Sequence, residues 1–385
     1  MSDVVIIGMG QTPVGEHWGE SLRSLSAKAI QAARREAGGI TPDALYVGNF
    51  FAAIASAQTN LGALLAENVS LSGIETYTIE AAEASGAAAF RQAYLAVESG
   101  FVKTAMVLGV EKCSDVIGAS QESAAAQSMD YDFEGMYGLT QAGQAALVMQ
   151  RYLYQYGLPA DALADFALLA HANAVNNPNA MFRKAIQREA YTRAGMVSNP
   201  LNLFDQAPLA DGAAAILLTR RSNAPAGLPF PLVKVVGSAS VTDTLALHDR
   251  ADLLAFEAAG LAVQRACRQA GCMPTDMDLF EMSDAFSVYA ALSLEAAGFA
   301  PRGEGWKMAR DGKLALNGDL PALTLGGDKA RGLPYGAAGV YQLAEAALQR
   351  RGQAGAGQVA NAHRALVETL GGPASTAVAH VLERA

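Results

Sequence analysis

Three observations predict a layered α/β fold for this chain of 385 residues. Short apolar runs alternate with amphipathic segments across short connections, which is the pattern of strands and helices packed in layers. The run Thr104–Gly109 is almost entirely apolar, as expected for a central strand that is covered on both faces. Hydrophobic residues make up 51% of the chain and charged residues 17%, which indicates a large core rather than a disordered chain.

The first half of the chain is expected to alternate strands and helices up to residue 109. Its expected strands are Val4–Gly8, Asp43–Asn49, Glu75–Ile79 and Thr104–Gly109. Its expected helices are Leu22–Ala37, Thr59–Glu67 and a segment from Ser85 to about Gly100. Long helical segments follow, among them Gln144–Tyr156 and Ala160–Asn177. They predict a helical insertion at about residues 113–205, after which the sheet resumes at Ala213–Thr219.

The second half follows a link rich in proline and glycine, Ala224–Pro231. Its expected strands are Leu232–Ser240, Asp278–Ser283 and Thr376–Arg384. Its expected helices are Ala255–Ala270, Val288–Gly298, Val340–Arg351 and Val359–Leu370. This order of elements repeats that of the first half. We therefore expect two halves, residues 1–225 and 226–385, with the insertion in the first.

The rest of the chain is organised around the stretch Ile79–Gly100. A turn of small residues leads straight into an amphipathic helix that is expected to begin near Ser85. The first turn of a helix presents free N–H groups and the positive end of the helix dipole. That position suits a reactive or anionic side chain, and the residue placed there is Glu83.

This stretch resembles the nucleophile loop of the thiolase superfamily, which reads E-x-A-C-A-S-G followed by G-A-A-A. The nearest type is that of the sterol-carrier-protein and archaeal thiolases. Glu83 stands where the family has its acyl-accepting cysteine. The resemblance extends over nearly all of the chain. It implies the duplicated five-layer α-β-α-β-α thiolase fold, with the insertion as its helical loop domain.

The other catalytic motifs of the family are altered at the same time. Ser283, in Ser283-Asp284-Ala285-Phe286, replaces the histidine of the H-D-A-F motif, whose aspartate is kept as Asp284. Leu333 occupies the histidine position of G-H-P-x-G. Glu368 falls where the archaeal type has the histidine of H-N-x-G-G. Because the nucleophile and its acid/base partners are all changed, ordinary thiolysis is disfavoured.

The resemblance implies an acyl-CoA substrate, so a CoA thioester is expected rather than a metal or nucleotide cofactor. A carboxylate at residue 83 suits a retro-aldol step, in which it removes the β-hydroxyl proton of a β-hydroxyacyl-CoA. The thioester enolate would then be stabilised by backbone N–H groups, with Gly372 as one candidate. A subset of the superfamily, the aldolases that cleave steroid side chains as CoA thioesters, also lacks the cysteine and depends on tyrosines. Tyr335 lies two residues beyond the corresponding position.

Each candidate residue also has a structural interpretation. Glu83 is either a general base or a fixed anion that fills a dead site, and Glu368 is either a second acid/base or a polar group satisfied near a loop. Asp284 is expected to act in catalysis or to orient a loop. In the insertion, His171 matches a family position that supports packing or the CoA site. Arg183 and Lys184 offer positive charge for CoA, or form an ordinary solvated surface.

Composition narrows the class of protein further. A net charge of -9 without a basic cluster argues against nucleic-acid binding. The three cysteines, Cys113, Cys267 and Cys272, match neither a metal-ligand spacing nor a disulfide framework. The amino-terminal residues lack the pattern of a signal peptide, and no apolar stretch is long enough to span a membrane. A cytoplasmic protein is expected.

The resemblance also implies partners and two alternative functions. Members of the family pair their central strands, so a homodimer is expected, and many archaeal-type relatives bind a small subunit with a zinc ribbon and an OB-fold. The first alternative is a conventional acyltransferase, which requires a cysteine in the pocket. The second is a catalytically silent subunit that shapes an active partner. The favoured function remains retro-aldol cleavage beside a CoA thioester.

Overall fold

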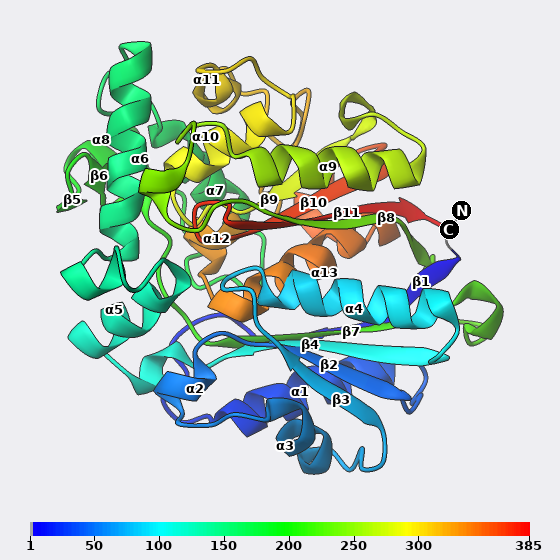
Figure 1. Ribbon diagram of the computed structural model, residues 1–385. Coiled ribbons are helices and arrows are strands. Elements are labelled where there is room, and N and C mark those ends of the chain that lie inside the picture. Colours follow the sequence, from blue (N-terminus) through cyan, green and yellow to red (C-terminus); the bar gives the residue numbers. More distant parts are fainter. Residues whose placement is uncertain (1–2) are drawn as a thin grey trace.

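The computed structural model describes residues 3–385, whose main sheet has the strand order β3-β2-β4-β7-β1-β8-β11-β10-β9. At its centre, β1 (Val4–Gln11) and β8 (Val233–Thr242) share two residue pairs, Val5–Lys234 and Ile6–Val233. The sheet therefore divides into an N-terminal and a C-terminal part. Figure 1 shows helices between these parts and on the outer face of each, which makes the five α-β-α-β-α layers expected from the sequence.

The N-terminal part of the sheet joins β1 to four further strands. These are β2 (Ala44–Gly48), β3 (Glu75–Ile79), β4 (Thr104–Glu111) and β7 (Gly212–Arg220). Strand β2 is parallel to β3 and β4, whereas β7 is antiparallel to β4 and β1. The outer side carries α1 (Leu22–Glu36), α2 (Ala52–Ala55) and α3 (Leu61–Asn68). Helix α1 begins where the hydroxyl of Ser21 accepts the N–H of Ser24 at 3.1 Å, as in a capping box.

The C-terminal part consists of β8 and three further strands. These are β9 (Leu279–Met282), β10 (Arg364–Gly371) and β11 (Thr376–Arg384). Helices α9 (Glu257–Ala270) and α10 (Ser287–Ala296) lie on its outer side, together with the short α11 (Gly305–Arg310). The short helix α12 (Gly327–Arg331) precedes α13 (Ala338–Arg351).

The central layer is formed by α4 (Ser85–Ser99) and α13, whose first turns meet through glycines. A Cβ atom at Gly86 would lie 2.6 Å from the carbonyl oxygen of Gly336. One at Gly339 would lie 2.7 Å from the backbone nitrogen of Ala87. Neither distance leaves room for a side chain. The small residues at the start of α4 are thus explained by the close approach of α13, which brings the Glu83 turn beside the loop before α13.

The helix expected over Val359–Leu370 is wrong, because this segment contains strand β10. It pairs in parallel with β9 and antiparallel with β11. A strand buried on both faces has a nearly continuous apolar sequence, so periodicity does not distinguish it from a buried helix. Here Leu366 faces the α10 side, whereas Val367 belongs to the core on the α13 side.

The insertion lies between β4 and β7 and packs on the C-terminal half. It contains α5 (Ala119–Ala125), α6 (Gln141–Tyr156), α7 (Ala164–Ala174), α8 (Arg188–Thr192) and the hairpin of β5 (Met196–Ser198) with β6 (Leu201–Asn202). Tyr152 on α6 donates its hydroxyl hydrogen to Glu295 on α10 at 2.5 Å. This packing fixes the first turn of α6 near the start of α4. Within residues 3–385, the helices are too short or too polar to cross a membrane.

Candidate active site

The position of Glu83 is set by a tight turn between β3 and α4. Ala82 has a φ of +51°, a left-handed conformation that is uncommon for a residue with a side chain. The hydroxyl of Ser85 fixes the turn, because it accepts the N–H of Ala81 at 2.9 Å and donates to the carbonyl oxygen of Ala82 at 2.6 Å. Glu83 is consequently held just before the first turn of α4, with 8% of its surface exposed.

Both oxygens of the Glu83 carboxyl are hydrogen-bonded. Gln141, the first residue of α6, donates its side-chain amide to Oε1 at 2.7 Å. The backbone N–H of Gly372, just after β10, donates to Oε2 at 2.7 Å. Burial raises the pKa of Glu83, whereas the bonds from Gly372 and Gln141 act in the opposite direction. The site thus holds a buried carboxyl that takes a proton more readily than an exposed one.

Hydrogen bonds connect Tyr335 to Glu83 through Gln141. Its hydroxyl donates to Oε1 of Gln141 at 2.9 Å, which leaves the amide hydrogens of Gln141 for Glu83 and for the hydroxyl of Ser128. Tyr335 is buried against Phe51, with ring centroids 4.3 Å apart, and has a φ of +26°. Strained backbone of this kind is found most often at functional sites. In this conformation Tyr335 positions Gln141.

The cavity beside Glu83 is almost closed. The residues that line it are Glu83, Gln141, Gln144, Ser283, Ala285, Phe286, Tyr289, Asp328, Leu333, Ala338, Leu370 and Gly372. Its free volume is about 10 Å³, which is close to the space that one water molecule requires. An acyl group therefore reaches Glu83 only after the cavity walls move.

Ser283 and Asp284 stand at the end of β9, but only Ser283 lines the cavity. Its hydroxyl accepts the N–H of Leu370 at 3.0 Å and so connects β9 to β10. Asp284 lies behind it and accepts the N–H of Asp328, under a turn where a Cβ at Gly327 would clash with its carboxyl. Burial, together with the neighbouring Asp328 carboxyl, raises the pKa of Asp284 to about 7. In this structure Asp284 orients the loop at the start of α12.

Glu368 does not line the Glu83 cavity. It lies within β10, in register with Met282 and Ala379, and has no exposed surface. Within the described chain, neither of its carboxyl oxygens makes a well-formed hydrogen bond. Burial raises its pKa to about 7, with a smaller opposing effect from the hydroxyl of Ser293 on α10.

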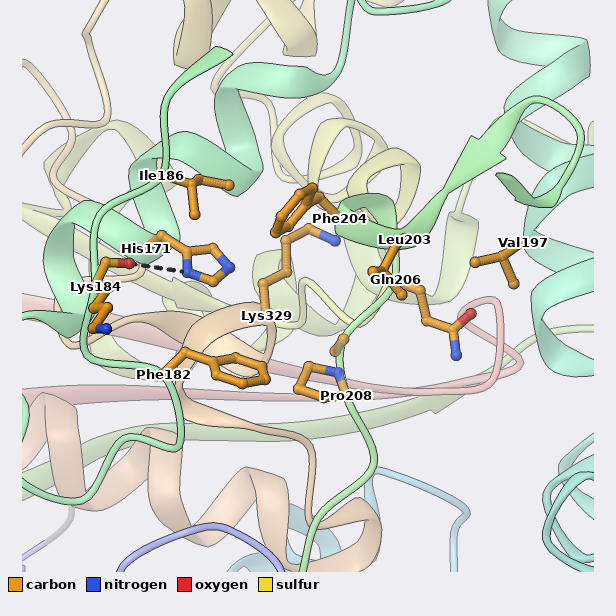
Figure 2. Close-up of a pocket in the computed structure, with 11 residues that line it drawn as sticks. His171, Phe182, Lys184, Ile186, Val197, Leu203, Phe204, Gln206, Pro208 and Lys329 are labelled. Carbon is orange, nitrogen blue, oxygen red and sulfur yellow. Dashed lines mark hydrogen bonds between the residues drawn. The ribbon is translucent and has the colours of Figure 1, made fainter. Parts of the chain in front are cut away.

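A second, larger cavity of about 530 Å³ lies in the insertion (Figure 2). Its lining is mainly apolar and includes His171, Lys184 and Lys329, whereas Arg183 is not part of it. The ring of His171 stacks on Phe182 at 5.9 Å, and its Nδ1 lies 3.3 Å from the carbonyl oxygen of Lys184. The buried amine of Lys329 donates to the carbonyl oxygen of Asp205 at 2.6 Å. Because consecutive residues Asp328 and Lys329 line different cavities, α12 separates the two.

Three contributors to the Glu83 site were not among the site residues predicted from the sequence. Gln141 lies 58 positions from Glu83, at the start of a helix in the insertion. Tyr289 and Asp328 line the cavity from α10 and α12. The glycine pair before Asp328 was the available signal, since it marks a close approach of backbone to another group.

None of the three cysteines lines the Glu83 cavity. Cys113 is packed with Phe51 and Tyr335, and burial raises the pKa of its thiol well above the ordinary value. Cys267 is a buried residue of α9, and Cys272 lies just after this helix. Neither of the two cavities is lined by a cysteine of the described chain. Residues 3–385 also hold no group of three or more His, Cys, Asp or Glu side chains arranged to bind a metal ion.

The fold and the position of this site define a class of enzymes, those built on the duplicated thiolase architecture. The family description "Thiolase, N-terminal domain" matches residues 4–222, and "Thiolase C-terminal domain-like" matches residues 239–384. The chain therefore belongs to the thiolase family and is an acyl-CoA enzyme of that family. This confirms the resemblance found in the sequence.

Three proteins that are similar to this chain illustrate the relationship. An acetyl-CoA acetyltransferase of Methanothermobacter thermautotrophicus is 38% identical over the whole of both chains. The benzoylsuccinyl-CoA thiolase subunit BbsB of Thauera aromatica is 29% identical over 91% of this chain and 89% of its own. The solved Ltp2-ChsH2(DUF35) aldolase superposes with a TM-score of 0.87 at 23% identity, covering 100% of this chain and 98% of that one. The last similarity establishes a shared fold.

Proposed function

We propose that this protein cleaves a β-hydroxyacyl-CoA by a retro-aldol reaction in which Glu83 is the general base. The proposal rests on the buried carboxyl of Glu83, which stands where thiolases have a cysteine. Burial raises its pKa, and it lies in a cavity without a thiol among its described lining residues. A base whose pKa is raised toward neutrality suits the abstraction of a hydroxyl proton.

The reaction proceeds in two balanced steps. The Glu83 carboxylate takes the β-hydroxyl proton, the Cα–Cβ bond breaks, an aldehyde or ketone leaves, and the electron pair moves into the thioester enolate. A proton then adds to Cα and gives the shortened acyl-CoA. Once Glu83 is protonated it holds the Gly372 N–H less strongly, which frees this donor for the thioester oxygen.

The larger cavity is proposed to hold the pantetheine arm of CoA. Its apolar walls suit the uncharged arm, and Lys184 lies at its lining, where positive charge favours the CoA phosphates. His171 shapes the wall through its contact with Phe182. The thioester would pass α12 to reach Glu83, so residues 328–333 are the part of the wall that has to move.

Two partners are proposed. A second copy of the chain would pair along β3, which lies at the edge of the sheet and carries the half-exposed Tyr77. A small subunit with a zinc ribbon and an OB-fold is the second, supported by the DUF35 component named with the aldolase of similar fold.

A silent subunit is the second candidate function, favoured by the closed Glu83 cavity of about 10 Å³. Acyl transfer is the activity in the name of the archaeal relative. In this chain it would require a nucleophile other than the buried Cys113.

One experiment distinguishes the three functions. The purified protein is incubated with a panel of β-hydroxyacyl- and β-ketoacyl-CoAs, and the products are identified by mass spectrometry. An aldehyde or ketone with a shortened acyl-CoA supports the lyase. Products that require free CoA indicate acyl transfer, and bound but unchanged esters indicate a silent subunit.

A further inference from the structure

The Glu83 cavity contains a second carboxyl group that the family motifs do not assign. Among its described lining residues, only Glu83, Tyr289 and Asp328 have titratable side chains. Asp328 stands in the first turn of α12 and is 1% exposed. The positions that hold catalytic histidines in thiolases are here Ser283, Leu333 and Glu368, and the first two do not titrate in this range. Glu368 lies outside the cavity.

The contacts of Asp328 leave one of its oxygens free. Oδ1 accepts a hydrogen bond from the guanidinium of Arg331 within the same short helix. Oδ2 is buried and has no hydrogen-bond partner within residues 3–385. The backbone N–H of Asp328 donates to Oδ1 of Asp284, whose own Oδ2 is likewise buried and unpartnered. The two residues are thus joined through a backbone hydrogen bond, their carboxyl groups interact electrostatically, and each has one buried oxygen without a partner.

The surrounding charges do not neutralise both carboxyls. Arg331 is shared between Asp328 and Glu345, the latter at 2.8 Å. Lys329 is the other cation that faces the pair, and its amine is bound to a backbone carbonyl oxygen. Glu281 adds a fourth buried carboxyl that interacts with Glu345. Asp205 is a further buried carboxyl that interacts with Lys329. Carboxyl groups therefore outnumber the buried cations Arg331 and Lys329, and neighbouring like charges in a buried site do not all ionise together.

We propose that Asp284 and Asp328 share one proton, and that Asp328 delivers it to Cα of the enolate left by carbon–carbon cleavage. This inference rests on the proposed lyase function and assigns its missing acid. In the step, the Asp328 O–H bond breaks, a C–H bond forms at Cα, and the enolate electron pair becomes the C–H pair. After the carbonyl product leaves, protonated Glu83 passes its proton through the cavity to the Asp284–Asp328 pair, which restores the Glu83 carboxylate and the shared proton.

Tyr289 is the other proton donor in the cavity, and its environment disfavours this role. Burial and the nearby Glu83 carboxyl raise the pKa of the Tyr289 hydroxyl above its ordinary value. Its conjugate base would be a buried tyrosinate. The conjugate base of Asp328 instead faces the Arg331 guanidinium, which stabilises the charge that remains after proton transfer.

The test compares Asp328→Asn, Asp284→Asn and Tyr289→Phe, with Glu281→Gln as the matched control. Glu281 is a buried carboxyl of the same cluster that does not line the cavity. Asp328→Asn is expected to lower kcat for shortened acyl-CoA by about 10²–10⁴-fold and to remove the alkaline limb of the pH profile. Asp284→Asn removes a like charge and is expected to shift that limb to lower pH. Glu281→Gln leaves the limb in place.

A second readout does not depend on turnover. Infrared spectra should contain a protonated-carboxyl band that Asp328→Asn and Asp284→Asn each remove, since the two residues share one proton. Loss of two different bands, or of neither, would contradict the shared proton even if the wild type is an active lyase. An unchanged rate and pH profile in Asp328→Asn, or loss of the alkaline limb in Tyr289→Phe, would overturn the assignment of Asp328. Failure of the wild type to cleave β-hydroxyacyl-CoA would separately overturn the lyase function. The infrared spectra would still test whether Asp284 and Asp328 share a proton.

Discussion

The backbone N–H of Gly372 donates to the carboxyl of Glu83 at 2.7 Å, which joins residues 289 positions apart. Glu83 belongs to the turn before α4 in the N-terminal half, and Gly372 follows β10 in the C-terminal half. The site therefore exists only when the two halves are packed together. This contact also competes with substrate, because the same N–H is a candidate donor to the thioester oxygen.

Glu83→Gln is expected to abolish turnover and to stabilise the fold above neutral pH. Burial raises the pKa of Glu83, so the folded protein binds more protons than the unfolded chain, and stability falls as pH rises above the unfolded pKa. The glutamine keeps the shape and has no charge to bury. Thermal unfolding should give a higher Tm than wild type at pH 8, and the difference should shrink at pH 4. A lower Tm at pH 8 would instead support a fixed anion that stabilises a dead site.

Glu368 should make the wild type less stable as pH rises. Its pKa is raised from 4.5 to about 7 in the folded protein, so stability is lost between these two values. The shift corresponds to about 3 kcal/mol. In urea unfolding, the free energy of unfolding of Glu368→Gln relative to wild type should rise by about that amount between pH 4.5 and 8. Glu189→Gln, at an exposed position, is the control and should leave the pH dependence unchanged.

Substitutions of Lys184 and Arg183 test whether the larger cavity is the CoA site, with Arg183 as the control. Both are exposed cations, but only Lys184 lines the larger cavity. Lys184→Ala is expected to weaken CoA binding up to about fivefold, as for the loss of one exposed charge interaction. Arg183→Ala should leave the affinity unchanged. Titration calorimetry with CoA at low salt measures both, and equal effects would argue against this cavity as the CoA site.

The edge strand β3 should form the homodimer contact. Beyond β3 the sheet has no further strand within the described residues, and Tyr77 is 58% exposed beside a groove that includes Leu95. Tyr77→Lys places a charge on this edge, a substitution that opposes strand pairing. Light scattering is expected to find a dimer for the wild type and a monomer for Tyr77→Lys. The control is Tyr154→Lys, on α6, where a tyrosine that is 82% exposed lies away from β3.

Local patterns in the sequence predicted an α/β fold, whereas the duplicated five-layer arrangement was implied by the resemblance to thiolases. Alternating apolar runs and helix periodicity indicated the layers, and the small residues before α4 marked the turn that holds Glu83. They did not separate the buried strand β10 from a helix, because a strand covered on both faces has no alternating pattern. That ambiguity is resolved by pairing with β9 and β11, which is a tertiary property.

The site was only partly accessible from the sequence, because its members meet through packing. Glu83 and Ser283 were expected and do line the cavity, whereas Glu368 points from β10 toward the α10 side. Gln141 comes from the insertion, and its contact with Glu83 depends on how α6 packs against α10. Spacing along the chain carries no information about such a contact.

Deuterium labelling of the cleavage products tests directly whether Glu83 is the general base of a retro-aldol reaction. Wild type and Glu83→Gln are incubated with a β-hydroxyacyl-CoA in D₂O without free CoA. We expect a carbonyl product and a shortened acyl-CoA that carries one deuterium at Cα. We also expect Glu83→Gln to lower the rate by about 10²–10⁴-fold. Product that forms only when free CoA is added, or at the same rate in Glu83→Gln, would contradict this mechanism.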